Sequence, residues 1–90
     1  MEISYDEAKR LRTLEERGLD FEDAPKVFSL PHFDLIDDRK DYGEMRYMTF
    51  GTLDGRHVSI VWTPRNKGRR IISMRHVHEE EIIARKKALD

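Results

Sequence analysis

The stretch EMRYMTFGTLDGRHVSIVWTPR, residues 44–65, carries the clearest structural signal in this 90-residue chain. Segments 44–53 and 56–64 are rich in β-branched and aromatic residues, which favour strands. They flank Asp54-Gly55, a dipeptide typical of a two-residue hairpin turn. With that turn, Leu53 faces Arg56, and the residue numbers of every cross-strand pair sum to 109. The sequence therefore predicts an antiparallel hairpin with a defined register.

Alternation along the two strands assigns their side chains to opposite faces of the hairpin. The apolar face receives Met45, Tyr47, Leu53, Val58, Ile60 and Trp62. The other face, called the second face below, receives Glu44, Arg46, Met48, Phe50, His57, Ser59, Val61, Thr63 and Arg65. In this register Glu44 lies opposite Arg65, and Arg46 lies opposite Thr63. A carboxylate, two guanidinium groups and a hydroxyl are therefore expected at one end of the second face.

Another strand is expected at residues 69–75, after a three-residue loop made of Asn66, Lys67 and Gly68. That loop pairs Arg65 with Arg69. It directs Ile72 and Met74 to the apolar face and adds Ser73 and Arg75 to the second face. Shorter strands are predicted at residues 2–5, which alternate polar and apolar residues, and at residues 33–36, as an edge strand.

Three helices are predicted from their end signals. Asp6 can cap a helix that continues to about Arg17 and stops at Gly18, with Leu11 and Leu14 on its inner face. A second helix lies within residues 20–30, and its helical part begins near residue 23 because a proline follows at position 25. The last helix starts near residue 78, with acids at 79–81 and bases at 85–87. We expect an α+β fold, an antiparallel meander of three to four strands with two N-terminal helices and one C-terminal helix packed on one face.

The length and composition limit the class of protein. Ninety residues suffice for a single domain, residues 1–90, and the 38% of hydrophobic residues predict a modest core. The chain has no cysteine, which excludes disulfides and thiol chemistry and is typical of a cytoplasmic protein. No segment approaches the roughly 20 apolar residues that a membrane-spanning helix needs, so no membrane association is expected.

The net charge of −1 conceals an uneven distribution of charge. Residues 1–45 have a net charge of −6, and residues 46–90 have a net charge of +5. Residues 55–78 contain no acid but six bases, Arg56, Arg65, Lys67, Arg69, Arg70 and Arg75. Such a segment indicates local contact with a phosphate-bearing partner. The alternative is that these bases pair with the acidic half of the same chain.

The residues expected on the second face suit RNA cleavage by the ribose 2′-hydroxyl, which needs a base, an acid and donors for the phosphate, but no metal. Arg46, Arg65 and Arg75 are candidate phosphate ligands. Glu44 completes the predicted catalytic set, but adjacent arginines lower the pKa of its carboxyl and leave it a weak base. An ordinary cross-strand ion pair between Glu44 and Arg65 is the alternative interpretation.

Further residues are predicted to bind RNA because they lie in or beside the basic segment, namely His57, Thr63, Lys67, Arg69, Arg70, Ser73 and His76. His76 can also act as an acid or base near neutral pH. Met48 and Phe50, if exposed on the second face, can stack on bases or anchor a partner protein. His76, His78 and Glu79 form too weak a motif for a metal site, so we expect neither a metal nor a cofactor.

The chain resembles the BrnT family of ribonuclease toxins from bacterial type II toxin–antitoxin systems, from residue 3 to about residue 85. The order and spacing of several short motifs carry this resemblance. They are Tyr5-Asp6 with Lys9, residues 18–24 with Val27-Phe28, Glu44-x-Arg46, Gly51, Val61-Trp62-Thr63-x-Arg65, and residues 70–75 with Glu81. The residues that match the family pattern at the site are Glu44, Arg46, Thr63, Arg65, Arg70, Ser73 and Arg75.

The resemblance implies a fold like that of the RelE superfamily and metal-independent endoribonuclease activity that inhibits translation. It also implies a BrnA-like antitoxin with a ribbon-helix-helix part. The toxin–antitoxin complex would contact DNA only through this part of the antitoxin. The chain departs from the family at several positions. Tyr5 replaces a tryptophan and Met74 an alanine, and the departures that put activity in doubt are Thr13 for Asn, Glu16-Arg17 for Lys-His, and Arg85 for Tyr.

Two hypotheses for function follow from the sequence. The first is an endoribonuclease toxin that holds the RNA backbone on the second face and the last strand. The second is a weak or inactive relative, which uses the same basic surface to bind RNA or a protein.

Overall fold

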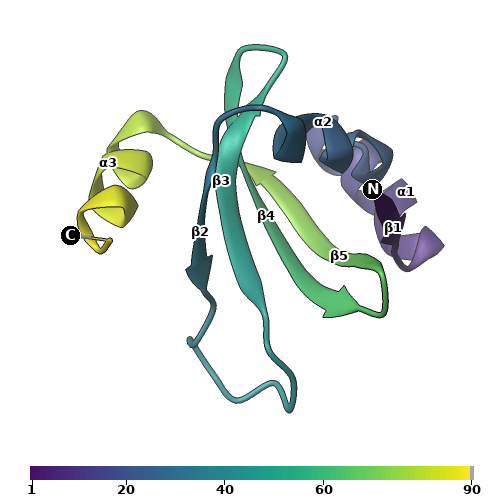
Figure 1. The fold of residues 1–90 in the computed structure, drawn as a ribbon. Coiled ribbons are helices and arrows are strands. Elements are labelled where there is room, and N and C mark those ends of the chain that lie inside the picture. The colour runs from purple at the N-terminus through teal and green to yellow at the C-terminus, as the bar shows by residue number, and fades with distance from the viewer. Residues whose placement is uncertain (90) are drawn as a thin grey trace.

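The predicted hairpin is present in the computed structural model, which describes residues 1–89 (Figure 1). Strands β3 (Tyr47–Leu53) and β4 (Arg56–Arg65) are antiparallel, with Tyr47 opposite Trp62 and Leu53 opposite Arg56. Asp54 and Gly55 have φ values of 51° and 79°, the left-handed values that a two-residue hairpin turn requires. The register derived from the sequence is therefore confirmed.

The sheet is larger than the predicted meander and is mixed rather than antiparallel. Its strand order is β1-β5-β4-β3-β2, with β1 (Glu2–Ser4) parallel to β5 (Gly68–His76) and β2 (Phe33–Ile36) antiparallel to β3. The parallel pairing places residues 2–4 beside residues 68–70, which are far away in the sequence. Alternation within each segment cannot predict such a pairing. The pairing also constrains Gly68, where a Cβ atom would lie 2.4 Å from the carbonyl oxygen of Glu2.

The connection between β4 and β5 differs from the predicted three-residue loop. Arg65 pairs with Gly68 across a two-residue turn, and an irregularity near Val61 and Trp62 then shifts the register by one residue. Beyond this bulge the pairs are those predicted, including Val61 with Ser73. A bulge adds one residue to one strand. The side chains beyond the bulge therefore point to the opposite face from the one they would have in a regular strand.

This bulge corrects the faces of four residues in β5, Arg69, Arg70, Ile71 and Ile72. Ile71, rather than Ile72, lies in the core and is 2% exposed. Arg70 pairs with Thr63 and so lies on the second face, whereas Arg69 lies on the core side. The guanidinium of Arg69 stacks over Phe28 and Trp62, with its carbon 4.1 Å and 4.3 Å from the ring centroids.

The helices begin and end where their capping residues predict. In α1 (Glu7–Arg17) the Asp6 side chain accepts a hydrogen bond from the Ala8 backbone, and Gly18 ends the helix with a φ of 69°. A short turn, η1 (Phe21–Asp23), leads into α2 (Ala24–Ser29), whose first turn contains Pro25. Helix α3 (Glu79–Lys87) follows the capping residue His78. No helix within residues 1–89 is long and apolar enough to cross a membrane.

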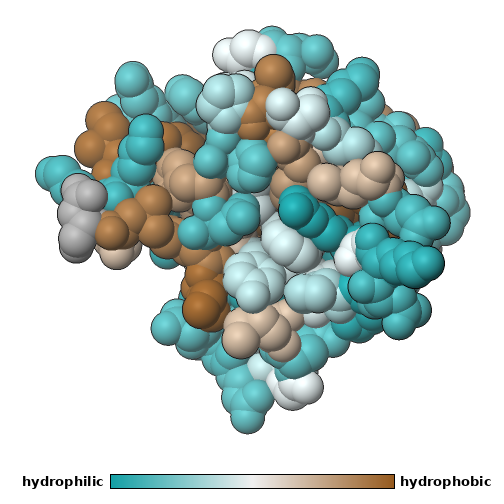
Figure 2. Space-filling model, in the orientation of Figure 1, coloured by the Kyte–Doolittle hydropathy of each residue, from teal (hydrophilic) through white to brown (hydrophobic). Residues whose placement is uncertain are grey.

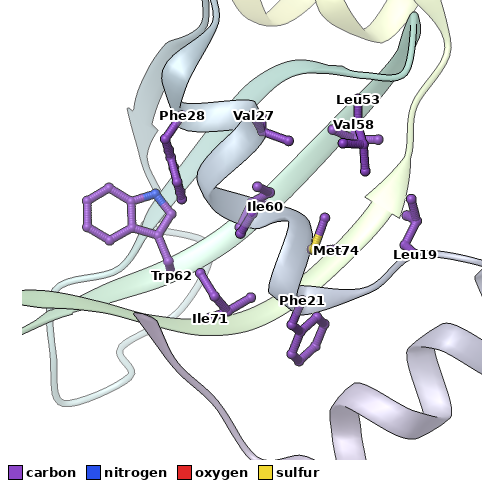
Figure 3. Packing of buried hydrophobic residues seen from close by; sticks show 11 residues of the cluster. Leu19, Phe21, Val27, Phe28, Leu53, Val58, Ile60, Trp62, Ile71 and Met74 are labelled. Carbon is purple, nitrogen blue, oxygen red and sulfur yellow. The ribbon is translucent and has the colours of Figure 1, made fainter. Parts of the chain in front are cut away.

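The core lies between α2 and the apolar face of the sheet (Figure 3). It comprises Leu19, Phe21, Ala24, Val27, Phe28, Leu53, Val58, Ile60, Trp62, Ile71 and Met74. Met45, which was predicted to belong to it, is instead 52% exposed. Met45 precedes the first residue of β3, so the alternation of the strand does not hold it against the core.

The inner face predicted for α1 is wrong. Leu11 and Leu14 are 53% and 38% exposed, and α1 contains no buried residue. The helix lies along the edge of β5 beyond the point where β1 ends, and the Arg17 Nη1 atom donates a hydrogen bond of 2.7 Å to the Met74 carbonyl oxygen. The contact of α1 with the sheet is therefore largely polar.

Helix α3 lies on the side of the sheet opposite α2, which corrects the prediction of one helical face (Figure 1). The second face is consequently covered near α3, and Met48 and Phe50 are only 3% and 1% exposed. Ile82 of α3 lines the same pocket as Phe50. These two buried side chains are thus unavailable as the base-stacking or partner-binding anchors predicted from the sequence. Apolar side chains are instead visible on the outer surface around α3 (Figure 2).

Candidate active site

Glu44 and two arginines meet at one end of the second face, as the hairpin register predicts. The Glu44 carboxylate accepts hydrogen bonds from Arg65 Nη2 at 3.0 Å and from Arg46 Nε at 3.1 Å. These bonds, the one from Arg65 first, lower the pKa of the Glu44 carboxyl below its usual value. Arg65 remains 46% exposed, so one guanidinium of this group is accessible from solvent.

Side chains around the two arginines hold them in place. The guanidinium carbon of Arg46 lies 4.1 Å from the centroid of the Tyr42 ring. The buried Thr63 hydroxyl donates to the Met45 carbonyl oxygen at 2.7 Å and accepts from Arg65 Nη1 at 3.4 Å. The Thr63 proton is directed to Met45, so the hydroxyl oxygen can only accept from Arg65 and thereby positions it. Arg70 pairs with Thr63 in the sheet and adds a third guanidinium to this end.

Lys9 is a further candidate for this site and was not among the site residues predicted from the sequence. It is half-buried in α1, and its pKa is lowered by burial and, next, by the positive charge of Arg46, with Arg12 and Arg70 acting in the same direction. Asp6 partly offsets these effects. The only indication of Lys9 in the sequence was its place among the motifs that resemble the family. Strand register could not indicate it, because register does not relate α1 to the sheet.

Lys9 also borders a small cavity between α1 and β5, with a volume of about 200 Å³. The cavity is lined by Lys9, Arg12, Thr13, Glu16, Arg17, Ile72 and Ser73. Three of the positions that depart from the family pattern, 13, 16 and 17, are therefore at this wall. We call Lys9, Glu44, Arg46, Thr63, Arg65 and Arg70 together the basic cluster.

Arg75 lies on the second face as predicted but apart from the basic cluster. It is five residues beyond Arg70 in β5, a separation of roughly 16 Å along a strand. Its Nη1 and Nη2 atoms donate to the Glu81 carboxylate at 3.1 Å and 2.5 Å. The ion pair lowers the pKa of Glu81 and joins α3 to the sheet. Arg75 and Arg46 can therefore contact only different phosphates of one RNA chain.

Of the other residues predicted to bind RNA, Ser73 lines the cavity beside Lys9, and Lys67 is exposed in the turn between β4 and β5. Arg69 stacks on the core aromatics, and His76 Nε2 hydrogen-bonds the Arg17 carbonyl oxygen at 3.2 Å. His57 lies near the other end of β4. Among residues 1–89, no three His, Asp or Glu side chains converge as a set of metal ligands.

Comparison with known proteins matches the chain to a family. The family model described as the ribonuclease toxin BrnT of type II toxin–antitoxin systems matches residues 5–81. A search of curated proteins found no match. The family description implies RNA as the substrate and an antitoxin as a partner. The match covers most of the chain and all of the basic cluster, and the chain thus belongs to the BrnT family of type II ribonuclease toxins.

Proposed function

We propose that this chain is an endoribonuclease that cleaves RNA at the basic cluster by attack of the 2′-hydroxyl, without a metal ion, and so inhibits translation in the cytoplasm. The observation that carries the proposal is the meeting of Arg46 and Arg65 on one carboxylate, at an accessible end of the second face, beside Arg70. Within residues 1–89, Arg70 forms no ion pair and is thus available to a phosphate.

The chemistry of the cluster fits stabilisation of a phosphorane-like transition state. Each guanidinium can donate two parallel hydrogen bonds to phosphate oxygens, and fixed donors of this kind stabilise charge that develops during reaction. Glu44 holds Arg46 and Arg65 in position while the site is empty, and an incoming phosphate competes with it for them. Its lowered pKa makes it a weak base, so we assign it a positioning role.

We further propose that the antitoxin is BrnA-like and contains a ribbon-helix-helix part, and that only this part contacts DNA. An acidic segment of the antitoxin laid over the basic cluster would neutralise the arginines and exclude RNA. The apolar anchors of such a complex must lie elsewhere than Met48 and Phe50, because α3 covers the surface around them.

The test is cleavage of a defined RNA by the purified protein in excess EDTA, with analysis of the product ends. We expect 2′,3′-cyclic phosphate or 3′-phosphate ends in the presence of the chelator. Arg46→Ala should lower the cleavage rate by about 10²-fold or more, because it removes a transition-state donor. Arg56→Ala, an exposed arginine at the far end of the hairpin, is the matched control and should cleave normally. Activity that vanishes with EDTA and returns with magnesium would contradict the mechanism.

A second candidate function is RNA binding with little or no cleavage. It is favoured by one of the residues that line the cavity between α1 and β5. Glu16 lies there near Lys9 and places a negative charge beside the basic cluster. If the protein binds RNA tightly but yields no products, this second function is correct. Replacing Glu16 and Arg17 by the Lys-His pair typical of the family should then raise the cleavage rate.

A further inference from the structure

The amine of Lys9 is the group of the basic cluster that is best able to exchange a proton near neutral pH. The guanidinium groups around it remain protonated at all relevant pH values. Glu44 is held in its ionised form by two arginines. Within residues 1–89, the Lys9 side chain forms neither an ion pair nor a hydrogen bond, whereas the carboxylate of Glu44 is fully engaged.

The position of Lys9 is fixed by the first turns of α1. Its backbone N–H and that of Ala8 both point to the Asp6 carboxylate, which caps the helix. Farther along, the hydrogen bond from Arg17 to the Met74 carbonyl holds α1 against β5. The side chain therefore starts from a rigid element and borders a cavity that has room for several water molecules, each of which occupies about 30 Å³.

We propose that Lys9 is the general base of RNA cleavage, which rests on the proposed function above. The neutral amine accepts the proton of the ribose 2′-hydroxyl while the 2′ oxygen forms its bond to phosphorus. The bond from phosphorus to the 5′ oxygen breaks, the 5′ oxygen leaves with that electron pair, and water supplies its proton. Arg46 and Arg70, which lie close enough to repel Lys9, hold the phosphate beside the amine.

The charges that face Lys9 favour its neutral form. From α1 these are Arg12 and Arg17 on the positive side and Asp6 and Glu16 on the negative side. From the sheet they are Arg46 and Arg70, with Glu44 and Arg65 next to Arg46. Together with burial, the balance lowers the pKa of the Lys9 ammonium, so a larger fraction of the amine is unprotonated at neutral pH than in a free lysine.

The experiment measures kcat/KM for cleavage as a function of pH, because this ratio reports the free enzyme. For the unchanged protein we expect kcat/KM to rise with pH and then level off. Lys9→Arg keeps the positive charge but cannot accept a proton, so its kcat/KM should fall by about 10²-fold or more and lose the rise with pH. Its affinity for a non-cleavable 2′-deoxy analogue should be unchanged. Lys26→Arg, an exposed lysine of α2 paired with Asp23, is the control and should behave like the unchanged protein.

NMR titration of the Lys9 side chain provides a readout that does not depend on activity, and we expect Lys9 to titrate at a lower pH than a free lysine. Titration of Lys9 at the pH of a free lysine, an unchanged pH profile in Lys9→Arg, or a rate that falls as pH rises would each overturn the assignment of Lys9 while leaving the proposed function intact. Absence of cleavage by the unchanged protein would overturn both proposals.

Discussion

At the scale of single residues, the burial of a carboxylate decides what its pairing with arginine does, as Glu44, Glu81 and Asp37 show. Glu44 and Glu81 are partly exposed and hold arginines of the second face. Asp37, by contrast, has a fully buried side chain. Arg39 Nε and Nη2 donate to it at 2.7 Å and 2.8 Å, and these bonds lower the pKa of the Asp37 carboxyl. We therefore expect the Asp37–Arg39 pair to matter most for stability.

Arg39→Ala should lower the free energy of unfolding at pH 7 by about 1–3 kcal/mol, because it leaves a buried carboxylate without its main donor. A carboxyl whose pKa is lowered by folding contributes stability above its unfolded pKa, and this contribution is lost as the pH falls through the folded pKa. The difference between the two proteins should therefore shrink below about pH 4. Urea unfolding at pH 7 and pH 3 measures it, with Arg56→Ala as an exposed control. A difference that grows in acid would contradict this account.

At the scale of the elements, α1 and α3 both contact the sheet through charged groups. Helix α1 uses Arg17, and α3 uses Glu81, which binds Arg75. Only α2 covers the apolar core directly (Figure 3). The two polar contacts are made at adjacent residues of β5, Met74 and Arg75, so both helices are held at the same part of that strand.

Two adjacent isoleucines of α3 test how this helix is attached. Ile82 is half-buried and lines a pocket with Phe33 and Phe50, whereas Ile83 is 51% exposed. Ile82→Ala should reduce the free energy of unfolding by about 1–3 kcal/mol, and Ile83→Ala should change it by less than about 0.5 kcal/mol. Chemical denaturation of the two variants compares the same substitution at neighbouring positions. Equal effects would mean that α3 is not packed on the sheet as described.

At the scale of the whole molecule, the near-zero net charge does not describe the surface that RNA would meet. The acidic half of the sequence neutralises the basic segment mainly at Arg65, through Glu44, while Arg75 is paired within its own half. Intramolecular pairing, the alternative considered from the sequence, therefore accounts for only part of the basic segment. The remaining charge gives the protein a local positive surface that responds to salt.

Binding of a non-cleavable single-stranded RNA should depend steeply on salt. If Arg46, Arg65 and Arg70 together neutralise about three phosphates, the affinity should fall roughly 20-fold between 50 and 200 mM salt. Arg70→Ala should reduce the slope of log affinity against log salt by about 0.7. Fluorescence anisotropy at several salt concentrations measures both quantities, and Arg56→Ala should retain the full slope. A slope near zero would rule out the basic cluster as the RNA-binding surface.

The sequence by itself determined those features that depend on neighbouring residues. Asp54-Gly55 permits only a tight turn, and alternation with period two then places Glu44 beside Arg65, as observed. The helix ends at Asp6 and Gly18 follow from capping, which is also local. These predictions are accurate because each rests on the conformational preferences of a few adjacent residues.

Only the tertiary structure decided which distant elements meet. A one-residue bulge exchanged the faces of Ile71 and Ile72, since every side chain after an inserted residue points to the other side. Helix α3 packs near Phe50, since Ile82 lines a pocket with that residue, and the local pattern of residues 79–87 does not specify this face. Lys9 reaches Arg46 and Arg70 because β1 pairs with β5 and brings α1 to that edge of the sheet. Such contacts depend on the combined burial of many side chains, which no local pattern specifies.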